Sequence, residues 1–321
     1  MFTEFKRFDK ATAANYPYEM INFWASQEEL EIVQNIEDKL NNHFRRLSEL
    51  SSSKRGEELG NKAVLATTSG KRAILADDIT RFTITQNNLG YIDMDKVRRT
   101  LREFFLSDNI IYLRRTAKKL IAAYSNQSFS FNKNIYGIRT NNEDRRSTKY
   151  ITSMLNSTIL NFYYLKKFST KKEGAFPEIQ TYFFETLPIP SINGQIYNDT
   201  VHAVVTLHDM IKHTKSEDTK KKLMECLDIL TLEIYVNDLL EINILEPIHD
   251  FFCEQRNNMI FEDLNEENKT IELEAIRTEL ENPDSEIHQS IIDYKNNNSP
   301  TAQAALKGIE EAQALAQIYI L

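Results

Sequence analysis

The chain has 321 residues, of which 41% are hydrophobic and 27% are charged, and its formal net charge at pH 7 is −8. This length allows two or three packed units, and the composition is typical of a soluble globular protein. The sequence contains no apolar run of about 18 residues, which excludes a membrane-spanning helix, and residues 1–7 lack the apolar stretch of a secretory signal, so we expect a cytoplasmic protein.

The first helix is predicted at 27–43. Ser26 and Glu29 have the spacing of a capping box, in which each side chain accepts a hydrogen bond from the other residue's backbone N–H. Leu30, Val33 and Ile36 then follow at helical spacing. Residues 1–43 are therefore expected to form an N-terminal segment and a connector helix.

Between about 46 and 140 the predicted elements are short and rich in β-forming residues. Strands are predicted at 63–68, 71–75, 79–84, 109–114, 120–124 and 135–139, with a short charged helix at 97–106. Ser69 and Gly70 suit a tight hairpin turn between the first two strands. This part of the chain is expected to be mainly β, with pairing between strands distant in sequence.

Helical spacing returns further along the chain. Apolar pairs predict one helix over 148–166, in spite of Asn156 and Asn161. From residue 199 onward the sequence is acidic and helical. Helices are predicted at 199–214, 217–242, 246–261, 269–281 and 284–295, followed by a break at 296–300 and a terminal helix at 301–321. Cys226 and Cys253 lie in these helices, and they are expected to be buried free thiols rather than a disulfide.

A polar loop at 171–179 separates the two helical regions. It contains Lys171, Lys172, Gly174, Phe176 and Pro177. Glycine permits close backbone approach, Pro177 favours an extended Phe176, and the lysines add positive charge. These properties suit a loop that lies against a polyanion, and they also suit an ordinary surface turn.

Signatures of catalysis are largely missing from the sequence. There is no glycine-rich nucleotide loop, no zinc-protease helix, no nucleophile elbow and no paired C-x-x-C. His202, His208 and His213 lack supporting ligands at metal-site spacing, so they are expected to face solvent. Asp284, Asp293 and Lys295 resemble a nuclease set only superficially, because they fall on a helix. No catalytic residue and no metal ligand is predicted.

Positive charge is concentrated in the middle of the chain. Residues 44–175 hold 25 lysines and arginines against 12 acidic residues, whereas the rest holds 14 against 35, from totals of 39 and 47. Such asymmetry indicates a basic binding domain beside an acidic partner or spacer, or a solvated basic face without a ligand. The basic pairs are Lys71 with Arg72, Arg114 with Arg115, and Lys118 with Lys119. They lie at predicted strand ends and loops, where side chains can reach phosphates and base edges.

Several segments together resemble a known family. They are LSEL at 47–50, KRGEELG at 54–60, RTAKKLIAAY at 115–124, residues 131–138, KYITSMLNSTILNFYY at 149–164, GAFPEI at 174–179 and LPIP at 187–190. In this order, over roughly 45–192, they resemble the TaqI-like C-terminal specificity domain. That family is the target recognition domain of adenine-specific DNA methyltransferases and of combined restriction–modification enzymes.

The resemblance implies a protein that reads duplex DNA and presents an adenine to a methyltransferase domain, which flips the base. It places the Lys118–Lys119 segment and the loop around Gly174 near DNA. The methyltransferase motif N-P-P-[YF] and its cofactor loop are missing here. The chain therefore resembles the specificity part of such an enzyme, without a cofactor of its own, and S-adenosylmethionine is expected only on a separate methyltransferase domain.

These inferences combine into one prediction. The fold is α+β, with a mainly β target recognition domain at 44–192 that carries a packed helix, a connector at 1–43 and an acidic helical domain at 193–321. The function is sequence-specific recognition of duplex DNA in a type II restriction–modification system, with a methyltransferase and an endonuclease part as partners. The expected DNA contacts are Lys71, Arg72, Arg114, Arg115, Lys118, Lys119, Lys171, Lys172, Gly174 and Phe176, although packing of the loop is the favoured role for Phe176.

Two other classes of function stay open at this point. A metal-dependent endonuclease fragment would need a cluster of carboxylates around Mg²⁺. A protein-interaction scaffold would have no affinity for DNA. In the recognition interpretation, the C-terminal helices are expected to dock a partner subunit in the manner of the spacer helices of specificity subunits.

Overall fold

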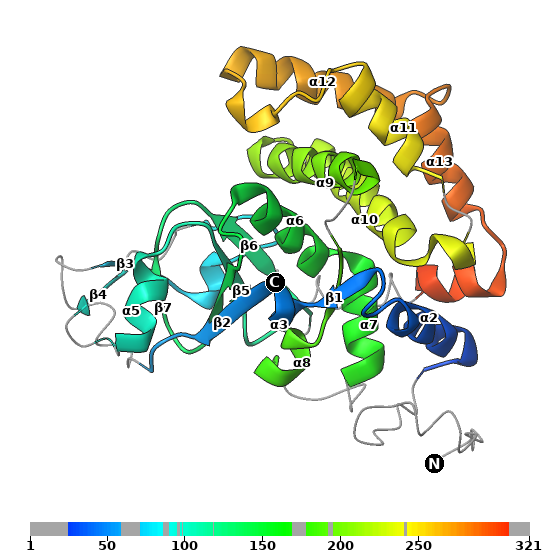
Figure 1. Cartoon of the computed structure of the whole chain (residues 1–321). Helices are drawn as coiled ribbons and strands as arrows, with labels where there is room; N and C mark the ends of the chain where they lie inside the picture. Colours follow the sequence, from blue (N-terminus) through cyan, green and yellow to red (C-terminus); the bar gives the residue numbers. More distant parts are fainter. Residues whose placement is uncertain are drawn as a thin grey trace.

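The computed structural model describes residues 25–58, 71–85, 90–94, 97, 99–117, 119–168, 178–191, 195–240 and 243–307. Within these ranges the strands all lie between residues 44 and 190, and long helices follow them (Figure 1). The predicted α+β class is confirmed. No helix in these ranges is long and apolar enough to cross a membrane. The predicted strand at 63–68 and turn at Ser69 lie outside the described residues.

The elements are as follows. The strands are β1 (Phe44–Arg46), β2 (Ser51–Arg55), β3 (Lys71–Ile74), β4 (Gly90–Ile92), β5 (Ile110–Arg114), β6 (Ala122–Ser125), β7 (Ser130–Phe131), β8 (Ile135–Thr140) and β9 (Pro188–Pro190). The α-helices are α2 (Gln27–Asp38), α3 (Leu47–Leu50), α5 (Arg99–Leu106), α6 (Arg145–Asn156), α7 (Thr158–Phe168), α8 (Thr181–Glu185), α9 (Gln195–His213), α10 (Glu217–Leu240), α11 (Leu245–His249), α12 (Glu266–Glu281) and α13 (Glu286–Lys295). The short turns are η2 (Ala76–Asp78), the π-helical η4 (Asp250–Glu254) and η5 (Phe261–Asp263).

A four-stranded antiparallel sheet, in the order β2-β8-β5-β6, is the centre of the strand-rich part. Both of its faces are buried. Ile111 and Leu113 of β5 join the core formed with α6 and α7, whereas Ile110 and Tyr112 join a second core with α5, β3 and β7. Successive residues of a strand point to opposite faces, so burial on both sides requires an unbroken apolar run. The sequence of β5 has such a run.

The two ends of the strand-rich part meet in a short ribbon. β1 pairs antiparallel with β9, and Arg45 lies opposite Ile189. The N–H of Leu47 also donates to the carbonyl of Leu187 at 2.9 Å. One apolar core nevertheless runs from Ile32 in α2 through the sheet to Ala305 near the C-terminus. The boundaries predicted at 43 and 192 therefore stay a prediction.

The helical part covers α6. α6 lies against α9, and α9 and α10 separate it from α11, α12 and α13 (Figure 1). Cys226 and Cys253 are free and buried, as predicted.

Two predicted helices end or change form early. The capping box at Ser26 and Glu29 is present, but α2 ends at Asp38 rather than at 43. The cause is a left-handed Asn41, with φ of 69°, which turns the chain into β1. The helix predicted at 246–261 becomes α11, η4 and η5, since Asn257 and Asn258 are also left-handed.

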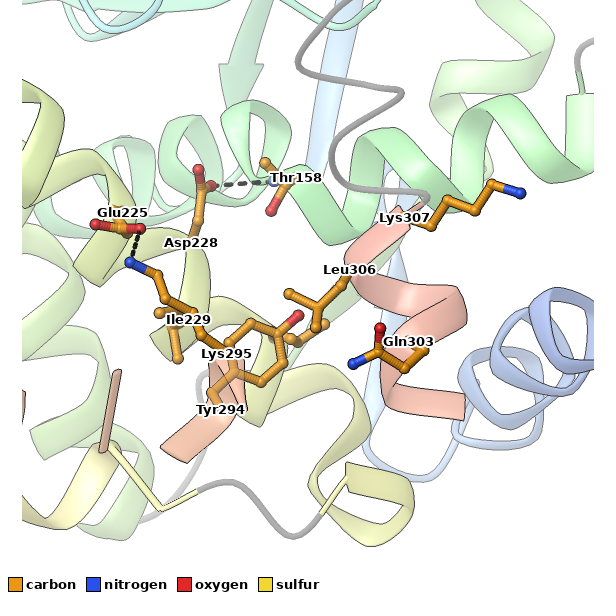
Figure 2. A pocket seen from close by; sticks show the side chains of 10 residues that line it. Thr158, Glu225, Asp228, Ile229, Tyr294, Lys295, Gln303, Leu306 and Lys307 are labelled. Carbon is orange, nitrogen blue, oxygen red and sulfur yellow. Dashed lines mark hydrogen bonds and ion pairs between the residues drawn. The ribbon is translucent and has the colours of Figure 1, made fainter. Parts of the chain in front are cut away.

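The helix predicted at 148–166 is two helices. Ser157 is extended, with φ of −65° and ψ of 147°, so the series of helical backbone hydrogen bonds is interrupted between α6 and α7. The hydroxyl of Ser157 accepts the N–H of Leu160 at 3.3 Å. Asp228 of α10 accepts the N–H of Thr158 at 3.1 Å, as the dashed line in Figure 2 shows. The start of α7 is thus capped partly from its own sequence and partly from α10.

Two asparagines at this break hold the chain that enters β6. The side chain of Asn156 donates to the carbonyl of Ala122 at 2.8 Å and accepts its N–H at 3.0 Å. Asn161 accepts the N–H of Leu120 at 2.7 Å. Among the described strands β6 is at the edge of its sheet, so its outer backbone groups have no described strand to pair with. The two amides satisfy these groups.

A tight turn stands where a strand was predicted at 79–84. The bridge between Ile79 and Ile84 closes it, and Phe82 at its tip has φ of 71°. Phe82 is fully buried, and its N–H donates to the carbonyl of Ala122 at 3.0 Å. Arg81 beside it contacts Asp228 at 2.6 Å and the carbonyl of Asn156 at 3.0 Å. The turn therefore inserts an arginine into the break between α6 and α7.

His208 is fully buried, so the expectation that the histidines face solvent is wrong at this position. The ring lies beside Phe82 and Tyr124, with centroid distances of 5.5 and 6.2 Å, and its Nδ1 is 3.1 Å from the carboxylate of Asp209. Burial lowers the pKa of His208, and the hydrogen bond and charge of Asp209 oppose this effect only in part. His202, half-buried, has a lowered pKa for the same main reason.

Replacement of Asn156 by alanine should destabilise the protein by about 2–3 kcal/mol, because the buried N–H of Ala122 loses its partner. Urea unfolding gives the free energy, and hydrogen exchange should accelerate at Ala122. Asn142→Ala is the control, since Asn142 is exposed and such changes stay within about 0.5 kcal/mol. Equal stability of the two variants would contradict the role of Asn156.

Acid should weaken the fold through His208. Since its pKa is lowered in the folded protein, the unfolded chain binds a proton there first, so this contribution is fully present above about pH 6.5 and is lost as the pH falls below it. We expect His208→Gln to reduce the loss of stability between pH 7.5 and 5.5 in urea unfolding, and His202, whose pKa is also lowered, to account for part of the rest. The exposed His43→Gln should keep the wild-type dependence.

Candidate nucleic-acid interface

One end of the four-stranded sheet gathers segments that the sequence assigned to DNA recognition. We define the strand-end rim as residues 55–58, 114–117, 132–134 and 178. The chain next to it continues into 59–70, 118 and 169–177, which lie outside the described residues. The rim thus contains the described residues that adjoin, in the chain, the segments with Lys118, Lys171 and Lys172.

Backbone hydrogen bonds join the rim residues that follow β2 to the start of β8 and to the turn before it. The N–H of Gly56 donates to Ile135 at 3.0 Å, and Lys133 donates to Glu57 at 2.9 Å. A Cβ at Gly56 would lie only 2.2 Å from the carbonyl oxygen of Asn132, so a larger residue cannot occupy this crossing. The turn at 132–134 is closed by Asn132, whose side chain accepts the N–H of Asn134 at 3.0 Å.

The two segments predicted to lie near DNA meet at the rim. Thr116 forms an antiparallel bridge with Glu178, and the N–H of Ile179 donates to the carbonyl of Arg115 at 2.8 Å. The guanidinium of Arg115 also binds the carboxylate of Glu178. In the chain, Glu178 directly follows the 171–177 stretch, and Thr116 lies two residues before Lys118.

The arginines of the rim are held by carboxylates. Arg114 is 24% exposed in its side chain and lies 2.9 Å from Asp77, whereas Arg115 is only 12% exposed. Arg55 contacts Glu58 at 3.1 Å and the carbonyl of Lys133 at 3.3 Å. The ammonium groups of Lys54 and Lys133 belong to exposed residues. Oriented guanidinium groups beside exposed lysines can provide both directed hydrogen bonds and phosphate contacts.

Several basic residues of the central segment have an internal role instead. Lys149, only 3% exposed, binds Asp209 and Glu262, each at 2.7 Å. Similar pairs with acidic residues of the surrounding helices are Lys166 with Glu29, Lys167 with Glu37 and Arg81 with Asp228. Part of the charge asymmetry in the sequence therefore reflects ion pairs between basic residues of the central segment and acidic residues of the helices around it.

The comparison with protein families is informative once this geometry is known. Residues 72–189 match the family model of the TaqI-like C-terminal specificity domain. The resemblance seen in the sequence is confirmed. The matched region begins in β3 and ends in β9, so it includes the break between α6 and α7 and all of the rim except residues 55–58.

Solved structures give weaker likenesses, and no curated protein matches the chain. The S subunit of a type I restriction-modification system from M. genitalium is similar with a TM-score of 0.32 and 14% identity, over 64% of this chain and 51% of that one. The HsdS subunit from Thermoanaerobacter tengcongensis has the same TM-score and identity, over 66% of this chain and 51% of that one. The chain thus spans about half the length of these subunits.

The structure separates the predicted contact residues of the specificity domain into groups. Arg114 and Arg115 lie together on the rim. Lys71 and Arg72 begin β3, at the end of that strand away from the rim. Lys71 binds the hydroxyl of Ser128 there, and Arg72 pairs with Tyr91 of β4. Lys118, Lys171, Lys172, Gly174 and Phe176 lie outside the described residues.

Lys119 is placed toward the interior. It is half-buried, and its pKa is lowered to about 8 by burial and by the nearby charge of Arg81, against the attraction of Asp228. The sequence did not single out Arg55 and Lys133 as contacts, although both are on the rim. The Asn-Lys-Asn turn that presents Lys133 was the signal available.

Thr158 and Asp228, at the break between α6 and α7, border a cavity of about 390 Å³. Asp228 and Ile229 of α10, Tyr294 and Lys295 of α13, and Gln303 near the C-terminus line it, and Lys295 pairs with Glu225 at 2.6 Å (Figure 2). Asp228 faces α7 through Thr158, so the cavity lies between α7 and the C-terminal helices.

Proposed function

We propose that the chain recognises a specific sequence of duplex DNA as the specificity part of a restriction–modification methyltransferase or combined enzyme. The observation that carries the proposal is the match of residues 72–189 to the specificity-domain family. The rim supports it, because Arg115 and Thr116 contact Ile179 and Glu178 there, directly after the 171–177 stretch in which Lys171 and Lys172 lie.

The proposal divides the contacts by chemistry. Exposed lysines such as Lys54 and Lys133 bind phosphates, which set affinity and register. Arg114 and Arg115, oriented by Asp77 and Glu178, are suited to base edges, since a guanidinium held in one plane can bind guanine through two hydrogen bonds.

Partners complete the activity in this proposal. A methyltransferase part binds S-adenosylmethionine and flips the target adenine, and an endonuclease part cuts unmodified DNA. The acidic helices α12 and α13 form the docking side for such a partner. This chain contributes recognition.

Binding to random-sequence duplex DNA should weaken steeply with salt, since each phosphate contact adds about 0.9 to the slope of log affinity against log salt. Fluorescence anisotropy between 50 and 200 mM salt measures this, and Lys171→Ala with Lys172→Ala should reduce the slope by about 2. Lys215→Ala in the acidic part is the control and should leave it unchanged. Affinity independent of salt would contradict phosphate contacts.

Glu178 and Arg115 should affect DNA binding in opposite directions. Glu178→Gln removes a half-exposed negative charge from the rim, so we expect binding to tighten by about threefold to fivefold. Arg115→Ala should weaken it by about 1–3 kcal/mol. Glu267→Gln, a charge change on exposed α12, is the matched control. If Glu178→Gln and Arg115→Ala both weaken binding to the same extent, the pair acts in folding alone.

A further inference from the structure

Three side chains with metal-binding atoms converge where α9 begins beside α11 and η4. The donor atoms of Asp199, His249 and Cys253 all lie within 4.8 Å of one another. The Nε2 atom of His249 is 3.4 Å from a carboxylate oxygen of Asp199. His249 and Cys253 are four residues apart, so they share one side of the helical segment that η4 continues. Single-turn π-helices such as η4 are frequent at functional sites.

Asp250 orients the imidazole of His249. Its carboxylate lies 3.4 Å from Nδ1, which leaves Nε2 directed toward Asp199. A carboxylate behind the second ring nitrogen is the arrangement that holds metal-binding histidines in the required tautomer and orientation. This contact is separate from the convergence of the three donors.

The surroundings favour a cation. A cavity of about 300 Å³ borders the cluster and is lined by Asp199, His249, Glu233 and Glu246, among others. Glu233 is fixed there by the N–H groups of Ile244 and Leu245, each at 2.7 Å.

Charges around Cys253 are mainly acidic. The carboxylates of Asp199, Asp250 and Glu254 act on its thiol, opposed by the guanidinium of Arg146. Cys253 itself is only 7% exposed, so a metal bound to it would be shielded from competing ligands.

We propose that Asp199, His249 and Cys253 bind a zinc ion, with a fourth position open to water from the cavity. Thiolate and imidazole donors together favour zinc over magnesium or calcium, and three protein ligands plus water is a known zinc arrangement. Binding replaces the thiol proton of Cys253, which passes to the buffer. The site joins the start of α9 to η4, and it does not depend on the proposed recognition of DNA.

A second set of donors shares the same histidine. His249, Asp250 and Glu254 also lie within 4.8 Å of one another. This set contains no sulfur, and it would take Asp250 away from its position behind the imidazole. The thiolate therefore distinguishes the two possibilities.

The test uses the full chain, stripped with a chelator and titrated with Zn²⁺ and, separately, with Co²⁺. We expect one tightly bound zinc per chain, and a thiolate-to-cobalt absorption band with Co²⁺. Cys253→Ser should abolish the band and the tight zinc, whereas Cys226→Ser, which changes the other buried thiol, should keep both.

Asp250→Asn gives a second measurement that keeps all three donors. Loss of the carboxylate behind His249 should weaken zinc binding about 10–100-fold while the cobalt band persists. Absence of bound zinc in the wild type, a band that survives in Cys253→Ser, or zinc binding without any band would each overturn the proposed donor set.

Discussion

The hydrogen bonds at the break between α6 and α7 are the constraint on which the arrangement of the molecule depends. Asn156 and Asn161 occupy the outer edge of the chain that enters β6, and Asp228 caps α7 from the helical part. Arg81 joins the same point from the turn at 79–84. Without the break, α7 would continue the axis of α6, and Asn161 would not lie beside the N–H of Leu120.

The position of this junction explains how the rim is held. The connection between β5 and β6 leaves the sheet at Arg114 and returns at Leu120, where Asn161 accepts its N–H. Its outer part is bound through Thr116 to Glu178. Both ends of the segment that carries Lys118 and Lys119 are therefore fixed by buried or strand-like hydrogen bonds. Binding residues on a fixed base lose little conformational freedom when they meet a ligand.

The basic residues of the central segment either form internal ion pairs or remain available to a ligand, and the sequence alone does not distinguish the two groups. Lys149, Lys166, Lys167 and Arg81 bind acidic side chains of the helices and are part of the fold. A buried pair such as Lys149 with Asp209 is costly to break because each partner would be left without compensation. The basic excess that is free of such pairs is therefore smaller than the composition suggests.

The sequence was sufficient to predict the α+β class, most strands of the central sheet and the resemblance to the specificity-domain family that residues 72–189 match. Local signals were strong there: β5 is an apolar run with a defined length, and Ser26 with Glu29 is a complete capping box. The sequence was insufficient at Ser157, because helical spacing continues through the break. The cap is completed by Asp228, which lies 70 residues beyond Thr158 in the chain.

The same limit applies to the contacts that join distant segments. Val204 and Ile211 lie at helical spacing from His208 and indicate the buried face of α9, but the ring contacts with Phe82 and Tyr124 come from segments distant in the chain. The cluster of Asp199, His249 and Cys253 was also missed, since Asp199 is 50 residues from His249 and only the pair four residues apart is a local pattern. Among the predicted contacts, Arg114 and Arg115 lie on the rim, at the end of β5. Lys71 and Arg72 begin β3, and this end of β3 is the one away from the rim.

The central claim is that the chain reads a DNA sequence, and selection from a pool of randomised duplexes tests it most directly. The purified chain is mixed with the pool at physiological salt, and the bound duplexes are recovered and sequenced over several rounds. We predict enrichment of one defined motif, bound about 10³-fold or more above random duplex. Recovery of a pool with no enriched motif, or no recovery of DNA at all, would contradict the account.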